Sequence, residues 1–114
     1  MTPRRRLTPR DHVLRAKSEA ALREDVRAAA ATFGWRFHFT YDSRRSPEGW
    51  PDVTLAKQMP DGTTRLIFLE LKTETGKATP AQEEWLALLA RVPSAFVWVL
   101  RPRDWDLLLR KLGG

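Results

Sequence analysis

The chain has 114 residues, which is about one domain's worth and excludes a second catalytic domain or a long repeat array. Hydrophobic residues make up 42% of the chain, which predicts a folded core, and the lack of cysteine excludes disulfides, thiolate metal sites and cysteine nucleophiles. The net charge is +6, and no apolar stretch approaches the roughly 20 residues needed to cross a bilayer. We therefore expect an intracellular protein in a reducing cytoplasm, without a membrane partner.

Most of the net positive charge lies at the N-terminus. Residues 1–17 carry six basic residues and one acidic residue, and they include Pro3 and Pro9. This composition predicts a flexible basic arm, which either binds a polyanion through its phosphates or only keeps the chain soluble. Residues 18–112 are predicted to form a single domain.

The first predicted elements are a helix and a strand. Ser18 is a good N-cap, and the apolar residues after it recur at helical spacing, which predicts a helix over 18–33 with Gly34 after its end. Apolar and polar residues then alternate over 35–40, as in a half-buried strand. A polar loop is expected over 41–49.

Two further strands are predicted as a hairpin, at 52–57 and 64–72, with a turn at 59–62. The second of these strands begins with apolar residues on both faces, which is typical of a central strand. One of its faces then changes from apolar residues to Glu70 and Lys72.

Thr79 and Gln82 frame a proline at the first helical position and form the pattern of a capping box, which predicts a second helix that ends before Pro93. A buried strand at 95–100 and a short amphipathic helix capped by Asp104 follow. The order αβββαβα predicts an α/β fold with a mixed central sheet flanked by helices. Because a helix links the last two strands, they should be parallel.

Three charged residues mark the predicted chemistry: Asp52 at the start of one strand, and Glu70 and Lys72 at the end of its neighbour. Period-two geometry places Glu70 and Lys72 on one face, and the hairpin can bring Asp52 beside them. Two carboxylates so close repel unless a cation or good hydrogen bonding compensates, and oxygen ligands suit Mg²⁺ or Mn²⁺. Alternatively, Glu70 and Lys72 form an exposed ion pair and Asp52 only follows a proline turn.

These residues resemble a known family. Pro51-Asp52 followed by Glu70-Leu71-Lys72 resembles the PD-(D/E)XK nuclease signature, whose restriction-endonuclease-like fold has an αβββαβ core. The segments around it resemble the VRR-NUC, or virus-type replication-repair nuclease, family over about Glu19 to Trp105. The similar segments are Gly34-Trp35, His38, Ser43-Arg44-Arg45-Ser46, Gly49-Trp50-Pro51-Asp52, Glu70-Leu71-Lys72, Thr79-Pro80-Ala81-Gln82, Trp85-Leu86, Arg101-Pro102 and Asp104-Trp105.

The resemblance implies metal ligands at matching positions. Asp52 and Glu70 would hold the metal with the carbonyl of Leu71, and Glu19 would be a more distant acid. The implied cofactor is Mg²⁺, with Mn²⁺ as a substitute, and no small-molecule cofactor is expected. For Glu19, interaction with the helix dipole is an equally good explanation.

The resemblance also implies two supporting side chains. Lys72 would orient the attacking water or stabilise developing negative charge, and Gln82 would help to position phosphate or water. For Gln82, helix capping is an equally good explanation.

Basic residues around this centre are expected to grip the nucleic-acid backbone without reading its sequence. The alternative for any of them is a solvated, exposed side chain. His38 is either near the site or an ordinary exposed histidine, and Trp50 is the tryptophan that could stack on a base. The expected backbone contacts are Arg4, Arg5, Arg6, Arg44, Arg45 and Lys77.

Together these features predict a metal-dependent endonuclease that hydrolyses DNA. The family resemblance implies branched DNA such as Holliday junctions, a homodimer, and a bacterial or phage-infected cell. Two alternatives stay open: a nuclease-fold DNA-binding module with weak or no catalysis, and a structural domain whose basic tail binds nucleic acid nonspecifically.

Overall fold

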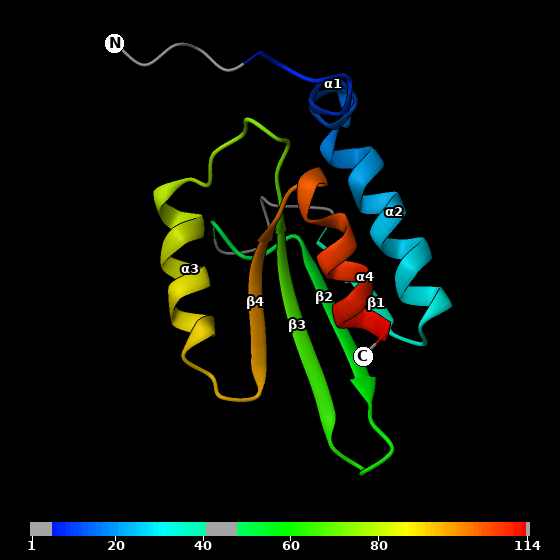
Figure 1. Ribbon diagram of the computed structural model, residues 1–114. Coiled ribbons are helices and arrows are strands. Elements are labelled where there is room, and N and C mark those ends of the chain that lie inside the picture. Colours follow the sequence, from blue (N-terminus) through cyan, green and yellow to red (C-terminus); the bar gives the residue numbers. More distant parts are fainter. Residues whose placement is uncertain (1–5, 41–47, 114) are drawn as a thin grey trace.

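A four-stranded mixed sheet forms the centre of the computed structural model, which describes residues 6–40 and 48–113 (Figure 1). The predicted α/β class is confirmed. The predicted order is present, with an added helix at the N-terminal end and a 3-10 turn before the last helix. The elements are α1 (Pro9–Ala16), α2 (Glu19–Thr32), β1 (Arg36–Phe39), β2 (Val53–Gln58), β3 (Thr64–Leu71), α3 (Pro80–Ala90), β4 (Ala95–Leu100), η1 (Pro102–Asp104) and α4 (Trp105–Gly113).

The strands lie in the order β1-β2-β3-β4. The β1–β2 and β2–β3 pairs are antiparallel, and the β3–β4 pair, linked by α3, is parallel, as predicted. Strand β3 is central, which agrees with its run of apolar residues. The predicted turn between β2 and β3 closes through a hydrogen bond from the Gly62 N–H to the Met59 carbonyl, with Gly62 at φ +88°.

One face of the sheet is covered by α2 and α4 (Figure 1). Along β3 this face carries Ile67, Leu69 and Leu71, all buried. The helices contribute residues at helical spacing, such as Leu22 and Val26 of α2. This continuous apolar layer is the main core and holds β2 and β3 in place. Its buried members are Leu22, Val26, Ala29, Ala30, Trp35, Val53, Leu55, Ile67, Leu69, Leu71, Leu100, Leu108 and Leu112.

The opposite face of the sheet is covered by α3 (Figure 1). Trp50, which precedes β2, packs edge-on against Phe68 of β3 and Trp85 of α3, with ring centroids 5.7 and 4.9 Å apart. Such edge-to-face pairs add to the area that aromatic rings bury. An aromatic layer therefore joins α3 to β3 next to Glu70.

Helix α1 was not predicted, since residues 1–17 were expected to form a flexible arm. Pro9 occupies the first turn, where its missing N–H costs nothing, and Thr8 and Asp11 form a capping box. A proline interpreted as a sign of an irregular arm instead begins a helix. Within the described residues, no helix is long and apolar enough to span a membrane.

The last helix is confirmed, but Asp104 caps differently from the prediction. Its Oδ2 accepts from the backbone N–H of Arg101 at 2.9 Å, which closes the 3-10 turn η1 before α4 begins. At the other end of α4, the Leu112 carbonyl accepts from the Trp35 indole N–H at 2.8 Å. These bonds fix α4 to the sheet and leave Arg101 at the end of β4.

Candidate active site

The predicted acids meet at one end of the sheet, where β3 and β4 end and β2 begins. Val53 pairs with Leu69 in the antiparallel register, so continuing that register by one residue places Asp52 opposite Glu70. A hydrogen bond from the Thr40 N–H to the Asp52 carbonyl, 3.0 Å, extends the β1–β2 pairing to Asp52. Asp52 and Glu70 are therefore positioned by backbone pairing.

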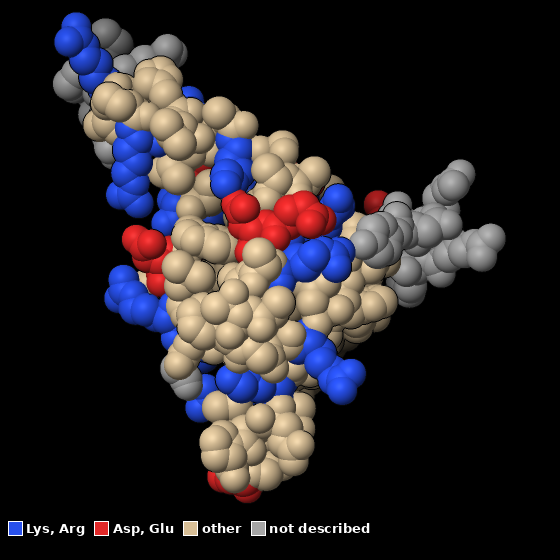
Figure 2. Space-filling view, turned by 90° about the vertical axis from the view of Figure 1, so that its right-hand side faces the viewer, with Lys and Arg blue, Asp and Glu red and all other residues tan. Residues whose placement is uncertain are grey.

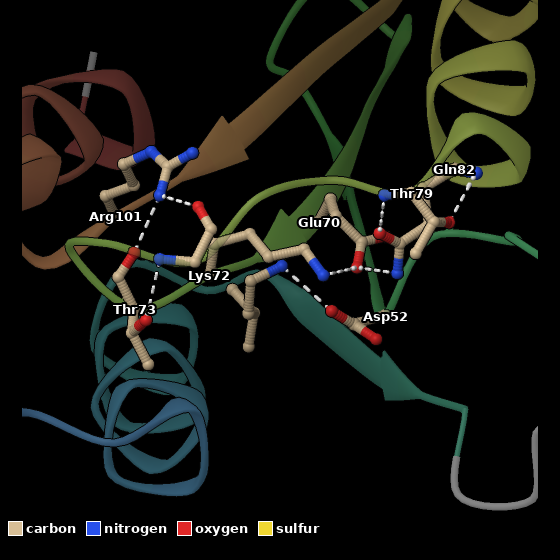
Figure 3. Close-up of polar contacts among 9 residues, drawn as sticks. Asp52, Glu70, Lys72, Thr73, Thr79, Gln82 and Arg101 are labelled. Atoms are coloured by element: carbon tan, nitrogen blue, oxygen red, sulfur yellow. Dashed lines mark hydrogen bonds and ion pairs between the residues drawn. The ribbon is translucent and has the colours of Figure 1, made fainter.

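Glu70 is buried, with only 1% of its surface exposed. Its Oε1 accepts from the Gln82 side-chain amide at 2.9 Å and lies 3.8 Å from the Lys72 ammonium (Figure 3). Its Oε2 is buried and has no hydrogen-bond partner. A buried polar atom left unpaired is costly, so this oxygen needs either a proton, which it can share with Asp52, or a cation.

The surroundings of Glu70 favour its neutral form. Burial is the main reason that the pKa of Glu70 rises from 4.5 to about 8. The Asp52 carboxylate raises the pKa further, both as a proton acceptor and by repulsion, and the Lys72 ammonium lowers it. Without a bound cation, Glu70 is therefore largely protonated at pH 7.

Asp52 is half-buried, and one of its oxygens is used by the backbone. Oδ2 accepts from the Leu71 N–H at 2.8 Å (Figure 3), which ties the start of β2 to the end of β3. This bond orients the carboxylate beside Glu70. The predicted role of the Leu71 carbonyl as a metal ligand stays a prediction.

The Lys72 side chain is 12% exposed and points back toward Glu70 (Figure 3). The alternative of an exposed ion pair is therefore wrong, because both members are largely enclosed. The Lys72 backbone N–H donates to the Leu100 carbonyl at 3.0 Å, which continues the β3–β4 pairing by one residue. The ammonium thus stands beside the Glu70 carboxyl group on a fixed backbone.

Gln82 has two roles at once. Its Oε1 accepts from the Thr79 N–H at 2.8 Å, which confirms the predicted capping box, and its Nε2 donates to Glu70. Helix capping therefore does not compete with a role at the site, because the same amide serves both. The second bond depends on how α3 packs on β3.

The approach of α3 to the site depends on Gly49. Its φ is +90°, and a Cβ at this position would lie 2.4 Å from the carbonyl carbon and oxygen of Ala81. Only glycine fits here, so the loop before Asp52 touches the first turn of α3 directly. Gly49 is not among the predicted site residues, although a Gly-Trp-Pro run before a strand indicates a tight approach.

Glu19 lies at the start of α2 and is exposed, as expected if its charge interacts with the helix dipole. Its charge nevertheless raises the pKa of Glu70. Among residues 6–40 and 48–113, no group of three or more His, Cys, Asp or Glu side chains is placed to hold a metal ion. Glu19 is thus not grouped with Asp52 and Glu70, and a metal here would need backbone or water oxygens beyond two carboxylates.

The other predicted residues that the structure describes make none of the hydrogen bonds or ion pairs of this cluster. His38 is exposed on β1, and Lys77 and Arg6 are exposed. The packing of Trp50 against two rings gives it a structural role, and base stacking stays a prediction. The last group of predicted contacts, Arg4, Arg5, Arg44 and Arg45, lies outside the described residues.

Charge is mixed on the side of the molecule shown in Figure 2. Acidic side chains gather near its middle, with lysines and arginines around them. On α2, Glu24 lies 3.7 Å from Arg23 and 3.4 Å from Arg27. Such pairs reduce the local positive potential, so this side is not a continuous basic surface.

Comparisons with protein-family models, curated proteins and solved structures find no match to the chain.

Proposed function

We propose that the chain is a metal-dependent endonuclease that hydrolyses DNA phosphodiester bonds, in accord with its resemblance to the VRR-NUC and PD-(D/E)XK nucleases. The observation that carries the proposal is the unpartnered, buried Oε2 of Glu70, a carboxyl group that the Asp52 carboxylate influences and whose other oxygen lies 3.8 Å from the Lys72 ammonium. In a structural ion pair within a core, the polar atoms have hydrogen-bond partners. In a metal site without its ion, some carboxylate oxygens have no protein partner.

The donor set fits Mg²⁺ or Mn²⁺, which prefer oxygen ligands and keep several waters. Asp52 and Glu70 would hold the ion, with the Leu71 carbonyl as the third protein oxygen. Bound there, the cation would supply the positive charge that polarises a phosphodiester and activates water.

The side chains around the two acids have separate tasks. Gln82 holds one oxygen of Glu70, so that the other stays directed away from the amide. The Lys72 ammonium, 3.8 Å from Glu70, can donate to the attacking water or to a phosphoryl oxygen that gains charge. Only 1% of the Glu70 surface is exposed, so bulk water is largely kept from its carboxyl group.

The proposed substrate is branched DNA, such as a Holliday junction, and the proposed assembly is a homodimer with two cutting sites. Strand β4 supports the proposed homodimer, because a strand at the sheet edge can pair with a second copy of the chain. Its sequence Ala95–Leu100 contains no charge or proline that would hinder such pairing. The proposed compartment is the cytoplasm of a bacterial or phage-infected cell.

One observation favours a second candidate, a nuclease-fold DNA-binding module with weak or no catalysis. The described residues supply only two acids at the site, and Glu70 must lose a proton before it can ligate a metal. Cleavage assays separate the two candidates.

The test uses linear, nicked, flapped and four-way DNA with Mg²⁺, Mn²⁺ or EDTA. We expect cleavage of branched DNA with either ion and none with EDTA. Asp52→Asn and Lys72→Met should abolish cleavage and leave DNA binding largely intact. Glu84→Gln, at an exposed carboxylate on α3, is the charge-matched control for Asp52→Asn, and Arg103→Met, at an exposed arginine, is the control for Lys72→Met. Binding without cleavage under all conditions would favour the DNA-binding module.

A further inference from the structure

We propose that Arg101 is a positioning residue for Lys72: it holds the turn at residues 73–76 against the Lys72 side chain, and so keeps the ammonium beside Glu70. This inference rests on the proposed function, because it assigns Arg101 to the reaction of that site. In the sequence, Arg101 is marked only by the resemblance of Arg101-Pro102 to the nuclease family.

Arg101 closes the turn that follows β3. One guanidinium nitrogen, Nη1, donates to the Thr73 carbonyl at 2.7 Å and also to the Gly76 carbonyl (Figure 3). Within the turn, the Gly76 N–H donates to the Thr73 hydroxyl at 3.0 Å. Hydrogen bonds from a charged donor are the stronger kind, so this single side chain fixes both ends of the turn.

The turn lies against the stem of Lys72. A Cβ added to Gly76 would be 3.8 Å from the Lys72 Cδ and 3.0 Å from the Thr73 hydroxyl, so the gap between the turn and the lysine stem is no wider than one added carbon atom. The backbone of Lys72 is bonded to Leu100 at the end of β4. Lys72 is therefore held at its backbone by β4, and the turn passes close beside its methylenes.

The position of Arg101 makes it suited to this task. It directly follows β4, and its own backbone N–H is bonded to Asp104, so the root of the side chain is fixed. Figure 3 shows the turn and Arg101 on one side of Lys72, and Glu70 with Gln82 on the other. The guanidinium hydrogen bonds described here go to the turn, so Arg101 acts on the site through Lys72.

The experiment compares Arg101→Met and Arg101→Lys with Arg103→Met, a charge-matched control at an exposed neighbour. The first readout needs no nuclease activity: the rate at which an acylating reagent modifies Lys72, followed by mass spectrometry, and amide hydrogen exchange at Gly76. We expect Arg101→Met to raise both rates about tenfold or more, because Lys72 loses its cover, and Arg101→Lys to keep most of the protection.

The second readout is cleavage kinetics on the DNA that the parent cuts best. A displaced ammonium weakens transition-state charge stabilisation, so Arg101→Met should lower kcat by about ten- to a hundredfold with KM within about twofold. Arg101→Lys should recover most of kcat, and Arg103→Met should match the parent.

Unchanged Lys72 acylation and Gly76 exchange in Arg101→Met would overturn the inference whatever the parent does to DNA. So would faster acylation with unchanged kcat in an active parent. If the parent protein cuts no DNA, the proposed function is refuted, and the catalytic task of Arg101 is refuted with it. The acylation result would still decide whether Arg101 holds Lys72 in place. Exchange protection of β3 and β4 checks that the variants fold.

Discussion

Replacement of Glu70 by glutamine should stabilise the metal-free protein at alkaline pH. An amide at this position keeps an acceptor for Gln82, offers a donor toward Asp52 and carries no charge to bury. The gain should be largest where the native carboxyl is forced to ionise in its buried setting.

The size and sign of the change in unfolding free energy with pH follow from the pKa of Glu70. In the unfolded chain the carboxyl ionises near 4.5, and in the folded protein near 8. Between pH 4.5 and pH 8 the folded state binds more protons than the unfolded state. The stability that Glu70 contributes is therefore fully present below pH 4.5 and is lost as the pH rises through 8. At about 1.4 kcal/mol per pH unit, the parent should lose roughly 2 to 3 kcal/mol between pH 6 and 9.

The assay is urea unfolding in EDTA at pH 6, 7, 8 and 9, followed by tryptophan fluorescence. Glu70→Gln should lose little stability over this range, and its advantage over the parent should grow with pH. Glu84→Gln, which removes an exposed carboxylate, should follow the parent. Parallel curves for Glu70→Gln and the parent would refute the reasoning, since they would show that Glu70 does not titrate in this range.

Three other variants test the contacts around the site. Gln82→Ala should cost about 1 to 3 kcal/mol of unfolding free energy, more than the roughly 1 kcal/mol of Thr79→Ala, because it removes a cap and a buried hydrogen bond; equal losses in urea unfolding would contradict this. Gly49→Ala should cost about 2 kcal/mol or more through its clash with Ala81, and an unchanged urea midpoint would exclude that contact. Deletion of 1–17 should weaken DNA binding and flatten its salt dependence, which an unchanged slope of affinity against salt would disprove.

Most of the sheet and α3 could be predicted from local patterns. Alternation defined β1, the apolar run marked β3 as central, and the Thr79–Gln82 pattern located the start of α3. Helix α1 was not predicted because the prolines and basic residues of this segment indicated a flexible arm. Pro9 follows a capping threonine, however, and this position favours the start of a helix. A proline can either break a helix or begin one, and its neighbours decide which.

The site was predictable only in part. Period-two geometry placed Glu70 and Lys72 on one face, but the burial of Glu70 depends on α3 and the aromatic layer above that face. No local pattern reports that packing. The same holds for Arg101, whose partners lie 25 and 28 residues away in the sequence.

The most direct test of the central claim, that Asp52 and Glu70 share a dication, is a Mg²⁺ titration by calorimetry at pH 7 in two buffers of different ionisation enthalpy. Because the pKa of Glu70 is raised to about 8, binding at pH 7 should release protons into the buffer in the parent, and Asp52→Asn should weaken binding strongly. Absence of Mg²⁺ binding, or equal binding by Asp52→Asn and the parent, would contradict the account.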